Sequence, residues 1–462
     1  MKRCILPGVV ILLAAAYGLF RPPPDKALPG WDEAAPRPNV IYILADDLGY
    51  GDLACYGGSH IETPHVDRLA AGGLRFTRHY AASPICVPSR FSLHTGLHTG
   101  HHRFTENGCK PFPDDLLTVH TLLKQAGYRT GHFGHLWQAM QPGSWGLDPG
   151  GKARDPDIQP AIDALRVPPG GHTIYPEEAG EPYIQGIDEL LTIWRRESRP
   201  LDQVGLYWPV LWRGGDQLVQ NTDYLEDAFV EGLLSFIRKQ DDERPFFAAY
   251  WSTIPHRPLQ VPGLVSDDIE VLYKAMVERL DDYVGQIMDA LESADLAGNT
   301  LVFFSSDNGS VDGSNGHLRG GKASLYEGGI RVPFIAHWPK LIQAGRVTDH
   351  LCSFTDLLPT LAGLSGVATP QNLDGYSLLP TLSGHGEPSQ HAYLYWWWSG
   401  NQAVRSGKWK ALYQHQQDLA YWQLFDVEKD PGEQQDLASA HPEVLTRLKD
   451  LARQARVPPA PR

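Results

Sequence analysis

Apolar runs and amphipathic stretches alternate along much of this chain. Residues 39–45 (NVIYILA) and 300–305 (TLVFFS) are predominantly apolar, and polar pairs follow each of them. Between them, residues 273–291 place apolar side chains at helical spacing. A continuous apolar run indicates a strand buried on both faces, as in a parallel sheet. We therefore predict a doubly wound α/β domain with a central, mostly parallel sheet.

The pattern changes after about residue 370. Short aromatic segments at 393–398, 409–413 and 423–427 are followed by a helical pattern over about 442–454. This change predicts a smaller C-terminal α+β subdomain with an antiparallel sheet. The aromatic run at 395–398 suits either stacking on sugar rings or packing within the sheet, and we favour packing.

The N-terminus has the features of a secretory signal. Lys2 and Arg3 precede a short apolar run that ends at Phe20, and three prolines follow. A membrane-spanning helix needs ~20 apolar residues, and this run is shorter. We therefore expect a secreted or periplasmic protein. The alternative is a protein held at the membrane by an uncleaved N-terminal anchor.

These patterns divide the chain into segments. We predict a signal peptide over 1–20, a linker over 21–37, a catalytic domain over 38–369 and the subdomain over 370–462. Within the catalytic domain, residues 141–220 are rich in Gly and Pro and show little periodicity. We interpret them as an insertion over the sheet, where substrate selectivity can reside.

Composition excludes some functions. With 40 basic and 54 acidic residues, the net charge is 40 − 54 = −14, which argues against binding of nucleic acid. It does not exclude an anionic substrate, because a cation and a few basic side chains can make one pocket positive.

The five cysteines show no CxxC spacing, which argues against a structural zinc site. If Cys86 has a separate role, then Cys55, Cys109 and Cys352 allow one disulfide at most.

Two polar pairs lie directly after the predicted strands. Asp46 and Asp47 follow the first strand, and Asp307 and Asn308 follow the second. Ligand sites of such sheets gather at the carboxyl ends of the strands. Three carboxylates and one amide oxygen suit Ca²⁺ or Mg²⁺. Asn308 also begins the only N-glycosylation sequon of the chain, which we interpret as a coincidence because a glycan there would destroy the metal site.

Residues 84–96 (PICVPSRFSLHTG) contain Cys86 within a Cys-x-Pro-x-Arg pattern. This segment resembles the signature of the sulfatase family, in which the pattern directs oxidation of the cysteine to formylglycine. The resemblance implies that a formylglycine-generating enzyme acts on this chain. It also implies that one hydroxyl of the hydrated aldehyde attacks the sulfur of a sulfate ester, while the other later expels sulfate.

Further family patterns follow in order. Residues 255–259 (PHRPL) resemble the segment whose histidine, here His256, meets the sulfate and the leaving oxygen. Residues 318–333 (LRGGKASLYEGGIRVP) resemble the segment that brings a lysine, here Lys322, to the sulfate. Arg90 fits the arginine that supports the formylglycine.

The resemblance extends from about residue 38 to the C-terminus and implies an alkaline-phosphatase-like α/β sandwich. It implies a sulfuric ester hydrolase acting on a sulfated carbohydrate or an aryl sulfate. The implied ligands of the cation, Ca²⁺ or alternatively Mg²⁺, include residue 86 together with the two polar pairs. His256 or Lys322 would protonate the leaving alcohol.

One segment departs from the family pattern. The family usually continues with Lys-Trp-His after a segment like residues 128–134, whereas this chain has His135 and Trp137 at the lysine and histidine positions. His135 can still donate to sulfate, but its charge depends on pH. Trp137 cannot accept a proton. The elimination step therefore proceeds differently here, or activity is weakened or lost.

Two alternative functions follow from these residues. One is a phosphodiester or phosphonate monoester hydrolase of the same superfamily, which would keep the metal site. The other is a catalytically impaired, sulfatase-like protein that binds sulfated glycans without cleaving them, and the departure at His135 and Trp137 is its support.

Overall fold

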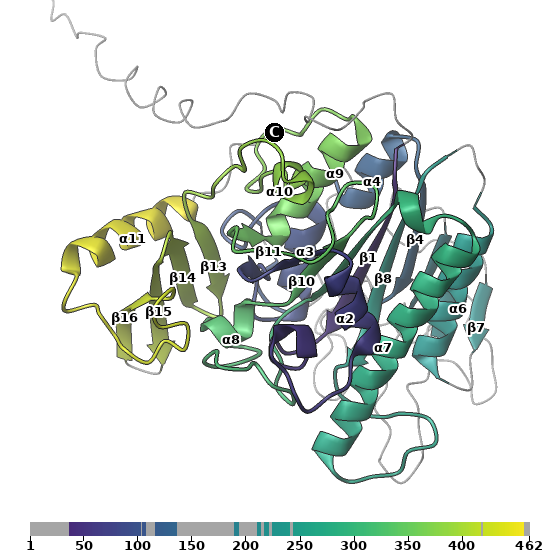
Figure 1. Ribbon diagram of the computed structural model, residues 1–462. Coiled ribbons are helices and arrows are strands. Elements are labelled where there is room, and N and C mark those ends of the chain that lie inside the picture. Colours follow the sequence, from purple (N-terminus) through teal and green to yellow (C-terminus); the bar gives the residue numbers. More distant parts are fainter. Residues whose placement is uncertain are drawn as a thin grey trace, which may run out of the picture.

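Figure 1 shows a large sheet with helices on both faces and, beside it, a smaller sheet covered by one helix. This computed structural model describes residues 37–102, 104–107, 116–135, 189–193, 210–213, 217–220, 224–240, 244–416 and 419–456. The predicted fold class is confirmed, since the centre of the large sheet is parallel and the smaller sheet is antiparallel.

The large sheet has the strand order β11-β2-β10-β9-β1-β8-β4-β5-β6-β7 among the described residues. At its centre, β1 (Asn39–Asp46) lies between β8 (Phe246–Pro255) and β9 (Thr300–Ser306), parallel to both. Next to β8 lies β4 (Arg129–Gly134), again in parallel. The outer strands are β2 (Leu74–Phe76), β10 (Phe334–His337), β11 (Arg346–Thr348), β5 (Glu189–Ile193), β6 (Val210–Arg213) and β7 (Gln217–Gln220).

Alternate side chains of β1 enter two separate cores. Val40, Tyr42 and Leu44 pack into the core on one face of the sheet. Ile41 and Ile43 pack into the core on the other face. Because successive side chains of a strand point to opposite faces, burial on both sides requires the apolar run seen in the sequence.

Helices cover both faces. The first core is closed by α3 (Cys86–Thr95), α4 (Val119–Gln125), α9 (Leu357–Ser365) and α10 (Leu379–Ser383). The second is closed by α2 (Pro64–Ala71), α6 (Leu225–Arg238) and α7 (Ile269–Ser293). Short elements connect the layers, namely β3 (His79–Tyr80), β12 (Cys352–Ser353), α8 (Glu327–Ile330), η1 (Ala54–Tyr56), η5 (Ala297–Asn299) and η6 (Phe354–Asp356).

The smaller sheet is an antiparallel meander of β13 (Leu394–Trp398), β14 (Asn401–Ser406), β15 (Trp409–Gln416) and β16 (Leu419–Asp426). One face packs against α11 (Pro442–Ala455). The other face packs against the main domain, with Trp396 beside Tyr80. Trp396 is 1% exposed, so the prediction that the aromatic run packs in the sheet is confirmed for this residue.

Buried charges join the two parts. Lys410 on β15 lies 3.0 Å from a carboxylate oxygen of Glu327 and 3.0 Å from one of Glu433. Glu327 also accepts a hydrogen bond from the Tyr80 hydroxyl, which in turn contacts Arg405. We call this group the junction cluster; it comprises Glu327, Arg331, Arg405, Lys410 and Glu433.

The segment interpreted as an insertion differs in part from expectation. Its described strands β5, β6 and β7 extend the edge of the large sheet instead of lying over it. Short strands of this kind form by pairing with a neighbouring edge, which a search for periodicity does not detect. The remainder of 141–220 lies outside the described residues.

Cys55 and Cys352 are free thiols, and Cys109 lies outside the described residues. Within the described part of the chain, no helix is long and apolar enough to cross a membrane. The predicted signal peptide, and all but one residue of the predicted linker, also lie outside it.

Candidate active site

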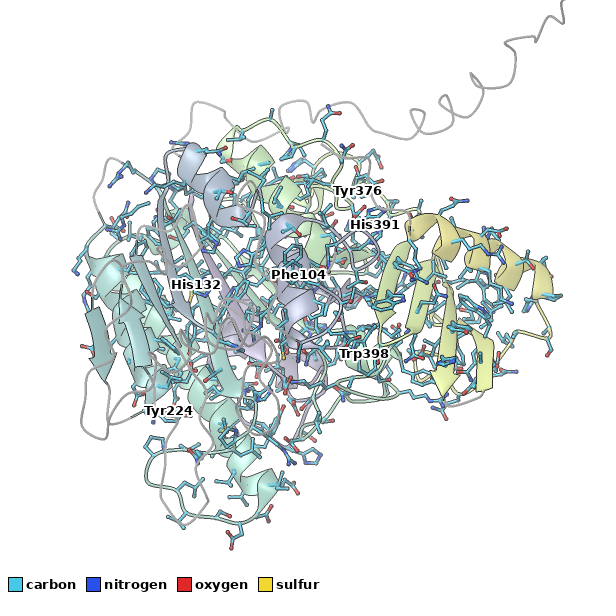
Figure 2. All side chains as sticks on the ribbon, turned by 180° about the vertical axis from the view of Figure 1, so that it is seen from behind. Phe104, His132, Tyr224, Tyr376, His391 and Trp398 are labelled. Carbon is cyan, nitrogen blue, oxygen red and sulfur yellow. The ribbon has the colours of Figure 1, made fainter. Side chains whose placement is uncertain are left out.

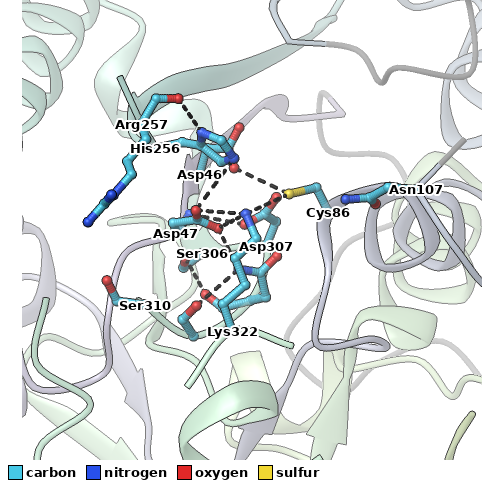
Figure 3. Close-up of polar contacts among 12 residues, drawn as sticks. Asp46, Asp47, Cys86, Asn107, His256, Arg257, Ser306, Asp307, Ser310 and Lys322 are labelled. Carbon is cyan, nitrogen blue, oxygen red and sulfur yellow. Dashed lines mark hydrogen bonds and ion pairs between the residues drawn. The ribbon is translucent and has the colours of Figure 1, made fainter. Parts of the chain in front are cut away.

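The predicted metal ligands meet at the carboxyl ends of β1 and β9. Because these strands are parallel and adjacent, Asp46 at the end of β1 lies beside the segment that follows β9. Asp47 N–H donates to Asp307 at 3.2 Å, and Asn308 Nδ2 donates to Asp47 at 2.7 Å. All four side chains are buried, and Figure 3 shows three of them, the aspartates, around one centre.

Asp47 has a left-handed backbone conformation, with φ of 72°. Such a conformation is unfavourable for a residue with a side chain and persists where the surroundings enforce it. Here the turn aims the Asp47 carboxylate at Lys322, whose Nζ lies 2.6 Å from one oxygen and 2.7 Å from the other. The strained turn thus serves to direct a carboxylate into the site.

Helix α3 brings Cys86 to the same place. Cys86 is the first residue of the helix and is buried, and its Sγ lies 3.5 Å from Asp46 Oδ1 and 3.3 Å from Lys322 Nζ. The N-cap residue, Ile85, has no side-chain oxygen to accept from the first turn. Asn107 supplies one from another loop, since its Oδ1 accepts from Val87 N at 3.1 Å. Position 86 therefore lies at a helix N-terminus, where partial positive charge favours oxyanions.

Arg90, one turn further along α3, clamps two of the carboxylates. Its Nη2 lies 3.1 Å from Asp46 Oδ2 and 2.8 Å from Asp307 Oδ2, and Nε donates to the same Asp307 oxygen. Nη1 donates to the backbone oxygen of His135, and the guanidinium lies over the Trp251 ring. Arg90 therefore holds the acidic groups in place from a fully buried position.

Lys322 and His256 reach the site from two other segments. His256 Nε2 lies 3.6 Å from Asp47 Oδ2, and Nδ1 contacts the backbone oxygen of Arg257, which directs Nε2 into the site. A glycine lets the segment that contains Lys322 approach the end of β9. A Cβ on Gly309 would lie 1.7 Å from Gly328 O, so only glycine allows the loop after β9 to lie this close to α8.

His135 also joins the site. Its Nδ1 lies 3.1 Å from Asp46 Oδ2, so one edge of the imidazole ring contacts a carboxylate. The structure thus brings His135 next to a proposed ligand, and its contact with sulfate stays a prediction. Trp137 lies outside the described residues.

The carboxyl groups of the site differ in pKa because the site holds fewer cationic side chains than carboxylates. Burial opposes ionisation of Asp46, but the Arg90 guanidinium holds the pKa of its carboxyl well below the usual value. Burial and the Asp46 charge raise the pKa of Asp47 to about 6, against the effect of Lys322. Burial and Asp46 likewise raise the pKa of Asp307 to about 6. A bound cation would relieve this repulsion.

The Cys86 thiol is unsuited to act as a nucleophile itself. Burial and the Asp46 and Asp307 carboxylates raise the pKa of this thiol well above its usual value. Reactive cysteines instead have a lowered pKa and carry a thiolate. A different chemical group at position 86 would be needed for attack on an ester.

Two observations fit a hard cation at this place. Ligand atoms of Asp46, Asp47, Cys86 and His256 all lie within 4.8 Å of one another. Asn308 Oδ1 is buried and accepts no hydrogen bond from a described residue, although buried acceptors are nearly always satisfied. A cation such as Ca²⁺ would satisfy that oxygen.

Comparison with known proteins decides the family. The family model named Sulfatase matches residues 38–367, and a model of the N-sulphoglucosamine sulphohydrolase C-terminal region matches residues 317–457. The chain belongs to the sulfatase family. It is a sulfuric ester hydrolase, as its relatives with matches across the chain are.

Two relatives and one solved structure illustrate the likeness. This sulfatase is 30% identical to an N-acetylgalactosamine-6-O-sulfatase of Bacteroides thetaiotaomicron, over 97% of each chain. It is 35% identical to human arylsulfatase A, over 96% of this chain and 90% of the relative. The crystal structure of Ps i-CgsB in complex with k-i-k-neocarrahexaose is 29% identical, with a TM-score of 0.73 over 91% of this chain and 93% of the other.

The fold is shared more widely than the sequence. A phosphonate monoester hydrolase of Agrobacterium radiobacter gives a TM-score of 0.67 at 21% identity, over 91% of this chain and 95% of the other. At this identity the likeness extends to the fold alone, which is the alkaline-phosphatase-like sandwich predicted from the sequence.

Several residues that support the site of this sulfatase were not predicted from the sequence. Tyr273 donates to Asp52 at 2.6 Å and lies 3.2 Å from the backbone oxygen of Asp47. Asp52 also accepts from the backbone of Gly49, which fixes the turn after β1. The last acidic residue of the segment DDLGYGD was a signal for this role. Asn107 had no such signal, because its contact with Val87 depends on the fold.

Figure 2 shows the side chains of the whole molecule from behind. His132, which it labels, comes from β4 and is fully buried, as are His94 and His120. Burial lowers the pKa of all three imidazoles, so they are neutral. They form part of the packing beneath the site and add no positive charge to it.

Proposed function

We propose that this sulfatase hydrolyses sulfate esters of a sulfated carbohydrate, with residue 86 as formylglycine and a divalent cation held beside it. The observation that carries the proposal is the position of Cys86. Its Sγ lies at a helix N-terminus, 3.5 Å from Asp46 and 3.3 Å from Lys322. The raised pKa of the thiol makes unmodified cysteine a poor nucleophile there.

Two groups that the chain acquires would supply the central chemistry. Formylglycine at position 86, installed by a formylglycine-generating enzyme, supplies a hydroxyl nucleophile when hydrated. A cation held by Asp46, Asp47, Asp307 and Asn308 supplies charge stabilisation for sulfate oxygens. Ca²⁺ fits these oxygen ligands, and Mg²⁺ is the alternative. The orphaned Asn308 Oδ1 supports this ligand set.

The remaining roles belong to side chains of this chain. Lys322 neutralises charge on the sulfate oxygens, because its ammonium lies 3.3 Å from Cys86 Sγ. Burial opposes the charge of Lys322, yet the Asp47, Asp46 and Asp307 carboxylates raise its pKa above the usual value, so the ammonium stays charged. His256, which directs Nε2 into the site, protonates the leaving alcohol. Arg90 keeps the carboxylates at their positions, and His135 donates to sulfate from beside Asp46.

Substrate class and location complete the proposal. The names of the relatives favour a sulfated sugar, since one is an N-acetylgalactosamine-6-O-sulfatase and a structural neighbour binds a neocarrahexaose. The basic and then apolar N-terminal segment supports export, so that the substrate meets a secreted or periplasmic enzyme. The predicted division into a signal peptide (1–20), a linker (21–37), a catalytic domain (38–369) and a C-terminal subdomain (370–462) is kept as part of the proposal.

The first test is chemical. We expect the peptide spanning residue 86, taken from protein made in its native host, to carry an aldehyde in place of the thiol. The same preparation should hydrolyse an aryl sulfate such as 4-nitrophenyl sulfate, and Cys86→Ala should abolish that hydrolysis. Cys55→Ala removes a half-buried thiol outside the site and should leave the activity unchanged.

Either of two results would contradict the proposed function. If residue 86 were an unmodified cysteine in protein that still hydrolyses the aryl sulfate, formylglycine would be excluded as the nucleophile. Faster turnover of a phosphodiester or phosphonate monoester than of any sulfate ester would assign the site to the other branch of the superfamily.

A further inference from the structure

An arginine stands at the edge of the active site with no role in the chemistry described above. Arg257 follows His256 directly in the sequence, and its side chain is 56% exposed. Figure 3 shows this side chain extending away from the cluster around Cys86, while His256 points into it. His256 therefore points toward the reacting group, whereas the adjacent Arg257 points toward solvent.

The exposed side chain is nevertheless held in a fixed orientation. Arg257 Nε donates to Asp312 Oδ2 at 2.7 Å, and Nη2 lies 2.5 Å from Asp312 Oδ1. The Asp312 side chain is only 10% exposed, so it provides a firm base. A paired guanidinium loses less conformational entropy on binding a ligand than a mobile one would.

The geometry of the pair leaves a second binding edge. Asp312 occupies the edge of the guanidinium formed by Nε and Nη2. The planar guanidinium carries five N–H donors, so the edge formed by Nη1 and Nη2 can bind another oxyanion with two hydrogen bonds. Lysine, as a point charge, could not serve two oxyanions in this way.

The simpler interpretation is a clamp between two loops. An ion pair at this exposure contributes about 0–1 kcal/mol to stability, which is little for holding a loop. The position favours a ligand, because Arg257 adjoins the histidine that faces the leaving group.

We propose that Arg257 binds a second anionic group of the substrate, a sulfate or carboxylate on the sugar residue on the leaving-group side. The substrate is then an oligosaccharide with more than one negative charge, and Arg257 selects it over an isolated monosulfate. This inference rests on the proposed function and narrows its substrate class. Asp312 acts as a positioning residue for Arg257.

The test compares substrates that differ by one charge. Hydrolysis is measured for 4-nitrophenyl sulfate, a monosulfated disaccharide, its disulfated form and its form with one sulfate and one uronate. We expect the wild type to prefer the substrates with the additional anion. Arg257→Ala should lower kcat/KM for those substrates by roughly 10- to 100-fold, the range for charged hydrogen bonds. The loss should appear mainly in KM, since Arg257 contacts no reacting atom.

Matched variants separate recognition from general effects. Arg453→Ala removes an exposed arginine that pairs with Asp450 on α11 and should change no kinetic constant. Arg257→Lys keeps the charge but lacks the two hydrogen-bonding edges of the guanidinium. Its kcat/KM for the substrates with the additional anion should lie between those of wild type and Arg257→Ala. The disulfated and uronate substrates show which anion the site prefers.

Two outcomes would overturn the proposal. One is an equal loss for 4-nitrophenyl sulfate and the disulfated disaccharide in Arg257→Ala, and the other is no preference of the wild type for the additional anion. If no sulfate ester is hydrolysed, the proposed function fails, and calorimetry still decides the role of Arg257. The single variant Cys86→Ala should then bind the disulfated disaccharide roughly 10-fold more tightly than the double variant that also carries Arg257→Ala, and equal affinity would refute the inference.

Discussion

Two groups of charged side chains are buried in this sulfatase, and their charges are balanced differently. The site cluster comprises Asp46, Asp47, Asp307, Arg90 and Lys322, with three acids and two bases. The junction cluster has two acids and three bases. The first therefore lacks a positive charge, whereas the second already has enough of them within the chain.

The pKa values of Glu327 at the junction and of two acids at the site differ in the direction that this balance of charges predicts. At the junction, burial opposes ionisation, but Lys410, Arg405 and Arg331 lower the pKa of Glu327 to about 2. At the site, burial and mutual repulsion raise the pKa of Asp47 and of Asp307 to about 6. The junction cluster is balanced by side chains of the chain itself, whereas the balance of the site cluster fits the cation that we propose there. Substitutions in one cluster at a time therefore test this difference.

The largest effect is expected from Asp47→Asn. This change removes a proposed cation ligand, and turnover of 4-nitrophenyl sulfate should fall by at least ~10³-fold, which corresponds to several kcal/mol of lost charge stabilisation. The melting temperature without added metal should stay the same or rise, because the variant removes one of three crowded carboxylates. Calorimetry on metal-free protein measures this. A clear fall in melting temperature would mean that the site cluster holds the fold as the junction cluster does.

The converse prediction concerns Lys410→Met. It leaves Glu327 and Glu433 buried without their shared ammonium, and the free energy of unfolding should fall by about 3–5 kcal/mol. Lys408→Met removes the ion pair between the half-exposed Lys408 and Asp426 and should cost at most ~1 kcal/mol. Denaturant titration compares the two variants. Equal losses would show that burial of the pair is unimportant.

Addition of Ca²⁺ should affect the two clusters differently. At a hundredfold excess over the dissociation constant, a ligand that binds only the native state adds about 2.7 kcal/mol of stability. We expect a corresponding rise in melting temperature for wild type and for Lys410→Met, but not for Asp47→Asn. A chelator should reverse it. If Asp47→Asn were stabilised as strongly as wild type, the cation would bind elsewhere.

Glu327 and Glu433 both contact Lys410, but their pKa values are shifted in opposite directions. Burial raises the pKa of Glu433 to about 7, although Lys410 opposes this. A carboxyl whose pKa is raised on folding binds its proton more tightly in the native state. Its contribution to stability is therefore present below pH ~4.5 and is lost as the pH rises toward 7. Wild type should lose stability over this window, and Glu433→Gln should lose less. If the curves of unfolding free energy against pH were parallel for wild type and Glu433→Gln, this prediction would be wrong.

The elements that the sequence predicted well are those whose pattern reflects burial. Strands β1 and β9 appear as apolar runs because both faces are covered, and α7 and α11 appear as amphipathic stretches. Their ends were harder to predict. Helix α7 begins at Ile269, before the apolar stripe, because the Asp268 side chain accepts from the backbone of Glu270 and Val271. A cap of this kind depends on one side chain and lies outside any periodic pattern.

The residues of the site also fall into those that the sequence predicts and those that it does not. Asp46, Asp47, Asp307 and Asn308 were predicted together because the ends of adjacent parallel strands must meet. The contact of Asn107 with Val87 and that of Arg257 with Asp312 join segments that are separated in the sequence. Nothing in a local pattern encodes such contacts, since they depend on how the loops are folded over the sheet.

The smallest effect is expected from Asn107→Ala, which tests whether the site cluster also depends on an uncharged support. Asn107 accepts from Val87 N in the first turn of α3, where Ile85 offers no cap. Loss of such a cap costs ~1 kcal/mol, and the cost should appear partly as misplacement of residue 86. We expect kcat for 4-nitrophenyl sulfate to fall by roughly 3- to 5-fold with KM nearly unchanged, because ~1 kcal/mol corresponds to about a fivefold change in rate. Asn107→Asp keeps the acceptor and should retain most of the activity. If alanine and aspartate reduced kcat equally, the amide itself would contact substrate, and the support of the helix would be a secondary role.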